Sequence, residues 1–301
     1  MTEEDGRLYG LGIVNMKAGL ACQLKAFRAL LDTYPLSQKG DALASGRLGL
    51  EVTVDQEGSS IGARALLKTE YGKCDAMLHA EHFYGSSPED YLPIAGIGKL
   101  LYQLLIRGRA AHAFRAHRGI NAIDDAARIV SSLDQLPLGE HDEVGKGTAC
   151  TLQIDGGYKQ YSIVVPEACK VIITRLTVPG ETRESALRDM EELDQSLRLR
   201  SSVEVTTRLP FYDAYCLDQS TAVLRVFTQV YKQITGRDPC FLGHSGITDA
   251  NVFVAEGGIP TVVFGPQRDD HHMAGEYVEK DSLVAVARVY AETARLFLGA
   301  S

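Results

Sequence analysis

The chain has 301 residues, of which 45% are hydrophobic and 23% are charged, and its formal net charge at pH 7 is −8. This composition is typical of a globular protein of about two domains. It argues against a nucleic-acid partner, which would require clustered Lys and Arg, and no apolar run is long enough to span a membrane. Residues 1–6 lack the features of a secretory signal and the six Cys show no paired short spacing, so the cytoplasm is the expected compartment.

Helices and strands alternate in the two outer parts of the chain. Periodicity predicts a helix over 17–33, a strand over 48–54, a helix over 61–71 and a strand over 76–80. Towards the C-terminus it predicts a helix over 220–235, a second helix that begins within 248–251, and a buried strand over 259–266. This alternation, with polar residues at the strand ends, is typical of an open α/β sheet that binds ligands at those ends.

The middle of the chain has a different order of elements. The pattern predicts β-α-β-β-α-β over 99–107, 120–133, 148–155, 168–177, 183–197 and 202–207. That order is typical of a ferredoxin-like unit. We therefore expect a discontinuous α/β domain made of residues 1–95 and 208–301, with an α+β domain inserted at 96–207.

Two stretches have the form of a two-metal amide hydrolase's active site, but each carries an amide where a carboxylate is needed. These are Asn15, within 12–19, and Gln56, within 54–59. Two nearby dications repel each other, and the neutral amide of Asn15 would bridge them poorly. A general base must accept a proton from the attacking water, which the amide of Gln56 cannot do, and loss of such a base costs about 10²- to 10⁴-fold in rate.

Other polar residues near the predicted strand ends could hold one metal ion. Carboxylate and imidazole ligands together suit zinc, so Glu57, Glu81 and His272 form a candidate mononuclear site. On a regular strand His79 and Glu81 would point to one face and His82 to the other, so these three are not expected to converge without a bend.

These residues resemble motifs of a known group, the aminoacylase, carboxypeptidase-G, succinyl-diaminopimelate desuccinylase and acetylornithine deacetylase metallopeptidases (family twenty). Segment 10–19 is similar to the family's Gly-Arg-Gly-x-x-Asp-Met-Lys-Gly-Gly, whose Asp bridges two zinc ions. Segment 55–57 resembles Asp-Glu-Glu, which gives the general base and a zinc ligand, and 80–82 resembles Gly-Glu-Pro, whose Glu holds the other zinc. Segment 272–278 resembles His-x-x-x-Glu-Tyr-Val. The resemblance covers essentially the whole chain.

The resemblance implies a zinc-peptidase-like α/β catalytic domain with an incomplete N-terminus, because the family's His-x-Asp ligand precedes the matched region. It implies hydrolysis of an amide bond in a small N-acyl amino acid or peptide-like substrate. It also implies zinc, with cobalt or manganese as alternatives, and the amides at Asn15 and Gln56 reduce the expected number to one ion or none per chain. Asn15 would mark the vacated bridging position, Gln56 the vacated base, and Glu57, Glu81 and His272 the metal ligands.

The inserted domain carries further resemblances. Segment 108–113 is similar to the family's Gly-Lys-x-Ser-His-Ala, which implies that His112 stabilises the oxyanion in a second subunit. Segment 175–180 resembles the strand whose Arg anchors a substrate carboxylate, which implies that role for Arg175. The family also implies a lid and a homodimer made through 96–207.

Other interpretations remain open. The chain could be an inactive homologue that binds a small molecule or a regulatory partner, or a fragment that needs a separate N-terminal segment. Asn15 could be an N-cap, and Asp55 with Glu57 could belong to a solvated turn. Asp249 could simply favour a helix start.

Overall fold

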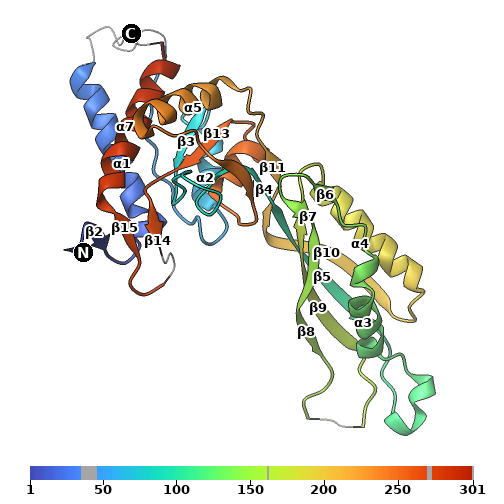
Figure 1. The fold of residues 1–301 in the computed structure, drawn as a ribbon. Helices are drawn as coiled ribbons and strands as arrows, with labels where there is room; N and C mark the ends of the chain where they lie inside the picture. The colour runs from blue at the N-terminus through green and yellow to red at the C-terminus, as the bar shows by residue number, and fades with distance from the viewer. Residues whose placement is uncertain (35–45, 161–162, 270–272, 300–301) are drawn as a thin grey trace.

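A computed structural model describes residues 1–34, 46–160, 163–269 and 273–299. The molecule is elongated, and its helices and strands gather in two parts joined where the chain crosses between them (Figure 1). Each part has its own cluster of buried apolar side chains. No helix within the described ranges is long and apolar enough to cross a membrane.

The first part contains both parallel and antiparallel strand pairs. β13 (Thr261–Phe264) pairs in parallel with β3 (Met77–Ala80), while β4 (Leu92–Gly96) pairs in parallel with β12 (Phe241–His244) and antiparallel with β11 (Tyr215–Cys216). A small antiparallel sheet has the order β1-β2-β15-β14, formed by Thr2–Glu4, Arg7–Tyr9, Tyr277–Glu279 and Arg268–Asp269. The predicted strands at 76–80 and 259–266 are confirmed as β3 and β13.

Helices cover these strands. They are α1 (Ala18–Thr33), α2 (Ile61–Leu67), α5 (Ala222–Thr235), α6 (Asp249–Asn251) and α7 (Lys280–Phe297), with π-helical turns at Ile13–Lys17 and Val252–Glu256. The helices predicted over 17–33 and 220–235, and the helix start within 248–251, are confirmed. α1 approaches β3 closely at Gly19, where an added Cβ would lie 3.1 Å from the Ala80 side chain. This contact brings the start of α1 to the end of β3.

The second part is the predicted β-α-β-β-α-β unit. Its antiparallel sheet has the order β10-β5-β9-β8, formed by Ser202–Tyr212, Gly98–Arg107, Ala168–Thr177 and Thr148–Gly156. α3 (Ala122–Ser131) and α4 (Arg183–Leu197) lie together beside this sheet (Figure 1). Buried side chains of β5, such as Tyr102 and Leu104, share a core with Ala126 of α3 and Met190 of α4. A short hairpin, β6 (Glu140–His141) and β7 (Gly145–Lys146), and 3₁₀ turns at Ala113–Arg118 and Leu133–Gln135 complete this part.

Two predictions for the segment after the first helix are wrong. Residues 48–54 form no strand, because no described strand pairs with them, and Val52 and Val54 are 65% and 72% exposed. The helix predicted over 61–71 ends at Leu67. Its end is set by Thr69, whose hydroxyl donates to Leu66 O (2.8 Å) and accepts from Gly72 N (3.3 Å), which turns the chain away.

Asn251 forms hydrogen bonds with both segments of the chain that connect the two parts. Its buried side-chain amide donates to the backbone oxygens of Ile97 (2.8 Å) and Asp213 (2.9 Å), which lie at the start of β5 and just after β10. Its Oδ1 accepts from Thr248 N (3.1 Å). One side chain therefore satisfies the carbonyls of the buried Ile97 and the half-buried Asp213, which are distant in sequence.

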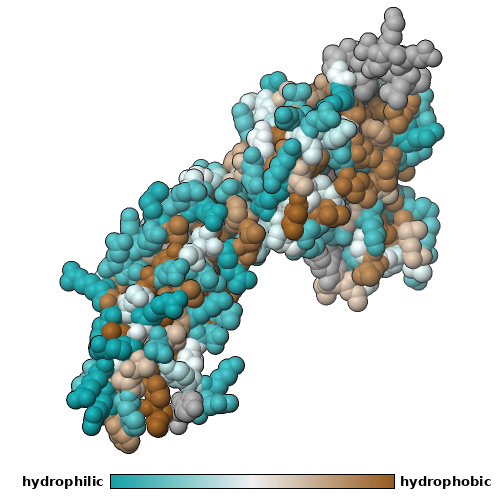
Figure 2. Space-filling view, turned by 180° about the vertical axis from the view of Figure 1, so that it is seen from behind, coloured by the Kyte–Doolittle hydropathy of each residue, from teal (hydrophilic) through white to brown (hydrophobic). Residues whose placement is uncertain are grey.

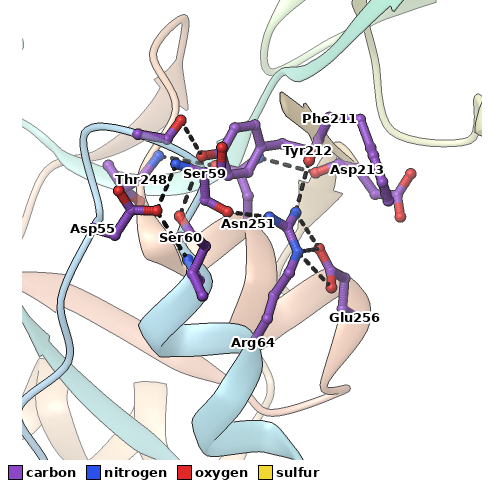
Figure 3. A network of polar contacts seen from close by, with 12 residues as sticks. Asp55, Ser59, Ser60, Arg64, Phe211, Tyr212, Asp213, Thr248, Asn251 and Glu256 are labelled. Carbon is purple, nitrogen blue, oxygen red and sulfur yellow. Dashed lines mark hydrogen bonds and ion pairs between the residues drawn. The ribbon is translucent and has the colours of Figure 1, made fainter. Parts of the chain in front are cut away.

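Arg64 ties the same region to the loop that precedes α2 (Figure 3). Its guanidinium pairs with Glu256 (2.7 Å), donates to Phe211 O (2.6 Å) and also donates to Ser59 O. Tyr212 contacts the loop too, since its hydroxyl lies 3.3 Å from Ser60 Oγ. The loop over 55–60 is thus fastened to the end of β10.

Replacing Asn251 with Ala should destabilise the protein strongly. The change removes the donor from the buried carbonyl of Ile97 and the half-buried carbonyl of Asp213, so we expect a loss of about 2–4 kcal/mol in the free energy of unfolding. Chemical denaturation followed by circular dichroism measures it. Asn121→Ala, which removes the N-cap of α3, is the matched control, with an expected loss of about 1 kcal/mol. Equal losses for the two variants would contradict the role given to Asn251.

Candidate metal centre

The loop before α1 turns Asn15 towards Glu57. The loop begins at Gly12, whose φ of +71° favours glycine, and Gly12 N donates to the buried carboxylate of Glu276. Asn15 Nδ2 donates to Glu57 Oε1 at 2.7 Å. Asn15 makes no capping bond to α1, which starts after Lys17, so the N-cap interpretation of Asn15 is wrong. Glu276 was not predicted as a site residue, although it lies in segment 272–278, which resembles a motif of the family.

The turn over 55–60 separates the roles of its acidic residues. The carboxylate of Asp55 accepts from Ser59 N (3.1 Å) and Ile61 N (3.4 Å), so it closes the turn. Gln56 points the other way, and its Nε2 donates to Glu81 Oε1 at 3.2 Å. Asp55 and Glu57 are both exposed in this turn, as the solvated-turn interpretation expects, and Glu57 also accepts a hydrogen bond from Asn15.

Glu81 is the buried centre of the site. It follows β3 directly and is 1% exposed. His79 Nε2 lies 3.7 Å from Glu81 Oε1, and His82 Nδ1 lies 3.0 Å from Oε2. Burial alone would raise the pKa of Glu81, but the contacts with His79 and His82 outweigh burial and lower that pKa to about 2. Glu81 is therefore ionised at neutral pH.

His79 and His82 both contact Glu81, and they do so through a bend of the chain at His82, the condition that the sequence analysis set for their convergence. The regular strand ends at Ala80, so the strict alternation of side chains does not continue to His82. The backbone after β3 is also packed against the loop after β13. An added Cβ at Gly265 would lie 1.5 Å from Glu81 O, so only glycine permits this approach.

The chemistry of these donors fits a divalent cation, although it lacks an anionic bridge. Among the described residues, the buried Glu81 Oε2 lies 3.0 Å from His82 Nδ1 in an ion pair and accepts no well-aligned hydrogen bond. Carboxylate oxygens of Glu57 and Glu81 beside imidazole suit zinc, cobalt or manganese. The side-chain amides of Asn15 and Gln56 donate N–H groups to these carboxylates. Rotation of each amide group by half a turn would direct its oxygen to the same place, where it could bind a cation. No cluster of three or more His, Cys, Asp or Glu suited to a metal occurs in the described ranges. The predicted third ligand, His272, lies outside them.

Asp249 is a further buried carboxylate near this turn. It is 1% exposed, its Oδ2 accepts from Thr53 Oγ1 at 3.4 Å, and its Oδ1 accepts no hydrogen bond from the described residues. A favourable interaction with a helix start does not account for it fully, because α6 has only three residues and Thr248 supplies the cap.

The two predicted residues of the second part are not brought to this centre within one chain. His112 is exposed on the loop after β5, and its Nδ1 accepts from Phe114 N at 3.2 Å. That loop lies at the end of the second part furthest from α1 and β3 (Figure 1). Action of His112 in a second subunit stays a prediction.

The structure argues against the substrate-binding role predicted for Arg175. Its side chain is 0% exposed and forms ion pairs with Asp189 (2.7 Å) and Glu181. It also donates to Tyr102 Oη at 3.3 Å. Arg175 lies on the face of β9 that packs on the helices, so its charge is already balanced inside the protein and does not reach a ligand.

Comparison with known proteins gives the family. The model of peptidase family M20/M25/M40 matches residues 1–296. The chain is 27% identical to acetylornithine deacetylase of Myxococcus xanthus, over 99% of this chain and 75% of that protein. It is 26% identical to succinyl-diaminopimelate desuccinylase of Sulfurimonas denitrificans, over 96% and 76% of the two proteins.

The fold agrees with a solved structure of the same kind. Aminopeptidase PepT from Bacillus cereus superposes with a TM-score of 0.77 at 22% identity, covering 98% of this chain and 75% of that one. The α/β class predicted from the sequence is confirmed by this likeness. Homologues in the family are metal-dependent hydrolases of amide bonds. The chain therefore belongs to peptidase family M20/M25/M40.

Proposed function

We propose that this protein is a metal-dependent hydrolase of the amide bond in a small N-acyl amino acid or peptide-like substrate, with a rate limited by Asn15 and Gln56. The observation that supports the proposal is a pair of hydrogen bonds made by the neighbouring residues Gln56 and Glu57. Gln56 donates to the buried, ionised Glu81, and Glu57 accepts from Asn15, so the loops before α1, before α2 and after β3 meet around these carboxylates. The relatives named for acetylornithine and succinyl-diaminopimelate supply the substrate class.

Glu57 and Glu81, with His272, would hold one divalent ion, and zinc suits these ligands best. When bound, such an ion polarises a carbonyl and makes water more nucleophilic. His79 and His82 keep Glu81 ionised. Gln56 can orient a group by hydrogen bonding but cannot take a proton from the attacking water, and Asp55 is engaged in its own turn. The chain thus keeps ligands but lacks the usual base.

We further propose that residues 1–95 and 208–301 form the catalytic domain and that 96–207 form a lid that also makes a homodimer. The separate cores of the two parts support this division. β8 is at the edge of its sheet, and its Leu152 and Ile154 are 57% and 50% exposed. Such an edge favours pairing with a second copy. All six cysteines are free, which suits the reducing cytoplasm.

Restoring the two carboxylates should raise activity. In Asn15→Asp/Gln56→Glu, position 15 would offer a bound cation an anionic ligand and position 56 would regain a group that can accept a proton. We therefore expect hydrolysis of N-acetylornithine or N-succinyl-diaminopimelate to increase by about 10²-fold or more with zinc present. Amine release measures the rate. The isosteric change at an unrelated amide, Gln135→Glu, is the control. A double variant no faster than the wild type, with both inactive at every metal tested, would sink the hydrolase proposal.

Disrupting β8 should separate the dimer. Leu152→Lys/Ile154→Lys places two cations on the exposed edge strand, so we expect the mass measured by light scattering to fall from two chains to one. Val284→Lys, which changes an exposed residue of α7, should leave the mass unchanged. A wild-type protein that is already monomeric, or a double variant that stays dimeric, would contradict the proposed interface.

A further inference from the structure

Arg268 brings a guanidinium to the backbone next to Glu81. It belongs to β14, at the edge of the small antiparallel sheet that β14 forms with β15, β2 and β1. Arg268 Nε donates to His82 O at 3.2 Å, and His82 Nδ1 lies 3.0 Å from Glu81 Oε2. The charged end of Arg268 is therefore attached one residue away from the buried carboxylate at the centre of the site.

The small sheet that carries Arg268 also supports the loop before α1. Val278 of β15 packs in one buried cluster with Val14 of that loop, and the carboxylate of Glu276, just before β15, accepts from Gly12 N. β14 and β15 lie below α1 and α7 in the view of Figure 1. Arg268 thus belongs to the framework that also positions the first loop of the site.

The two Nη groups of Arg268 are not used by the described part of the chain. There they donate no hydrogen bond, and no carboxylate oxygen lies within 4 Å of them. Burial raises the pKa of Asp90, against the lowering effects of the hydrogen bond from Tyr84 N and of the charge of Arg268. The carboxylate of Asp90 is itself held by Tyr84 N (3.0 Å) and Ser86 Oγ (3.5 Å). Arg268 is partly exposed, so a dissolved anion can reach it.

Other cations of the first loop and of the predicted site are already engaged. Lys17 Nζ donates to Leu11 O of its own loop at 2.7 Å, Arg64 pairs with a carboxylate, and Arg175 is buried in ion pairs. Apolar residues gather over the first part on the face that Figure 2 shows, whereas the second part is mainly hydrophilic. Ion pairs are screened less beside apolar groups than in bulk water.

We propose that Arg268 binds the free carboxylate of the substrate whose amide bond lies at the site around Glu57 and Glu81, and that it is thereby a specificity-determining residue. This inference rests on the proposed function and names its substrate class, which is N-acyl amino acids or peptides with a carboxylate on the carbon next to the amide nitrogen. N-acyl amines, which lack that carboxylate, are excluded from the class.

Geometry and charge both support this role. In such a substrate the carboxylate follows the amide bond by one residue, and His82, to which Arg268 is bound, follows Glu81 by the same step of about 3.8 Å. A guanidinium binds a carboxylate through two parallel hydrogen bonds, which the Nη groups can supply while Nε stays on His82. The positive charge also offsets the repulsion that an anionic substrate meets from Glu57 and Glu81.

A matched pair of ligands tests the inference through binding. N-acetylleucine and N-acetylleucinamide differ only by a carboxylate against an amide. By calorimetry on the zinc-loaded wild type, we expect N-acetylleucine to bind on the order of tenfold more tightly. Arg268→Gln should bind both with the affinity that the wild type has for N-acetylleucinamide. Arg268→Lys, which keeps the charge without the planar fork, should keep part of the preference. Arg225→Gln, at an exposed position of α5, should keep all of it.

A residue that only supported the chain after β3 would, when replaced, weaken both ligands equally, so that result in Arg268→Gln would overturn the inference. Equal binding of both ligands by the wild type, binding of neither, or a preference that survives in Arg268→Gln would do the same. Hydrolysis of both compounds, recorded on the same samples, reports separately on the proposed function. Turnover of both at equal efficiency would keep the hydrolase and remove Arg268 from its specificity. The expected binding preference without any turnover would keep Arg268 as a carboxylate-binding residue and contradict the hydrolase.

Discussion

The buried charge of Glu81 governs the arrangement of the site. An ionised carboxylate that is 1% exposed is stable only if neighbouring groups balance it. His79 and His82, which flank Glu81 in sequence, contact its two carboxylate oxygens. The amide of Gln56 donates to the same carboxylate from the turn before α2. Asn15 balances Glu57 in the same manner. A cation and an amide N–H group are thus alternative ways of balancing each carboxylate, and a carboxylate at 15 or 56 would add repulsion unless a cation were bound.

Close backbone approaches bring these residues together. Gly19 lets α1 approach the end of β3, and Gly265 lets the loop after β13 lie against Glu81. The turn that carries Gln56 and Glu57 is in turn fixed to the end of β10 by Arg64 and Tyr212. Since β10 belongs to the second part of the molecule, a movement of that part would be transmitted to the site through these contacts. Asn251 forms hydrogen bonds with both segments that connect the two parts.

Regular elements could be predicted from the sequence because their periodicity reflects local packing. The order of helices and strands over 99–207 follows from the periodicity of apolar residues. The bounds of α1, β3 and β13 lie within one or two residues of the predicted ranges. Residues 48–54 alternate like a strand but lack a described neighbour to pair with, which a local pattern does not reveal. Arg175 followed a motif, yet the face of β9 on which it lies is set by its register with β5. The convergence of His79 and His82 depends on where β3 ends, which sequence predicts poorly.

The account depends most directly on whether Glu57 and Glu81 hold a metal ion, so metal content is the decisive measurement. Elemental mass spectrometry of purified wild-type protein, compared with Glu57→Gln, tests it, because Glu57 is exposed and its loss should not prevent folding. We predict about one equivalent of zinc, cobalt or manganese per wild-type chain and a marked loss in the variant. Less than about a tenth of an equivalent in the wild type, even after incubation with excess metal, would contradict the account.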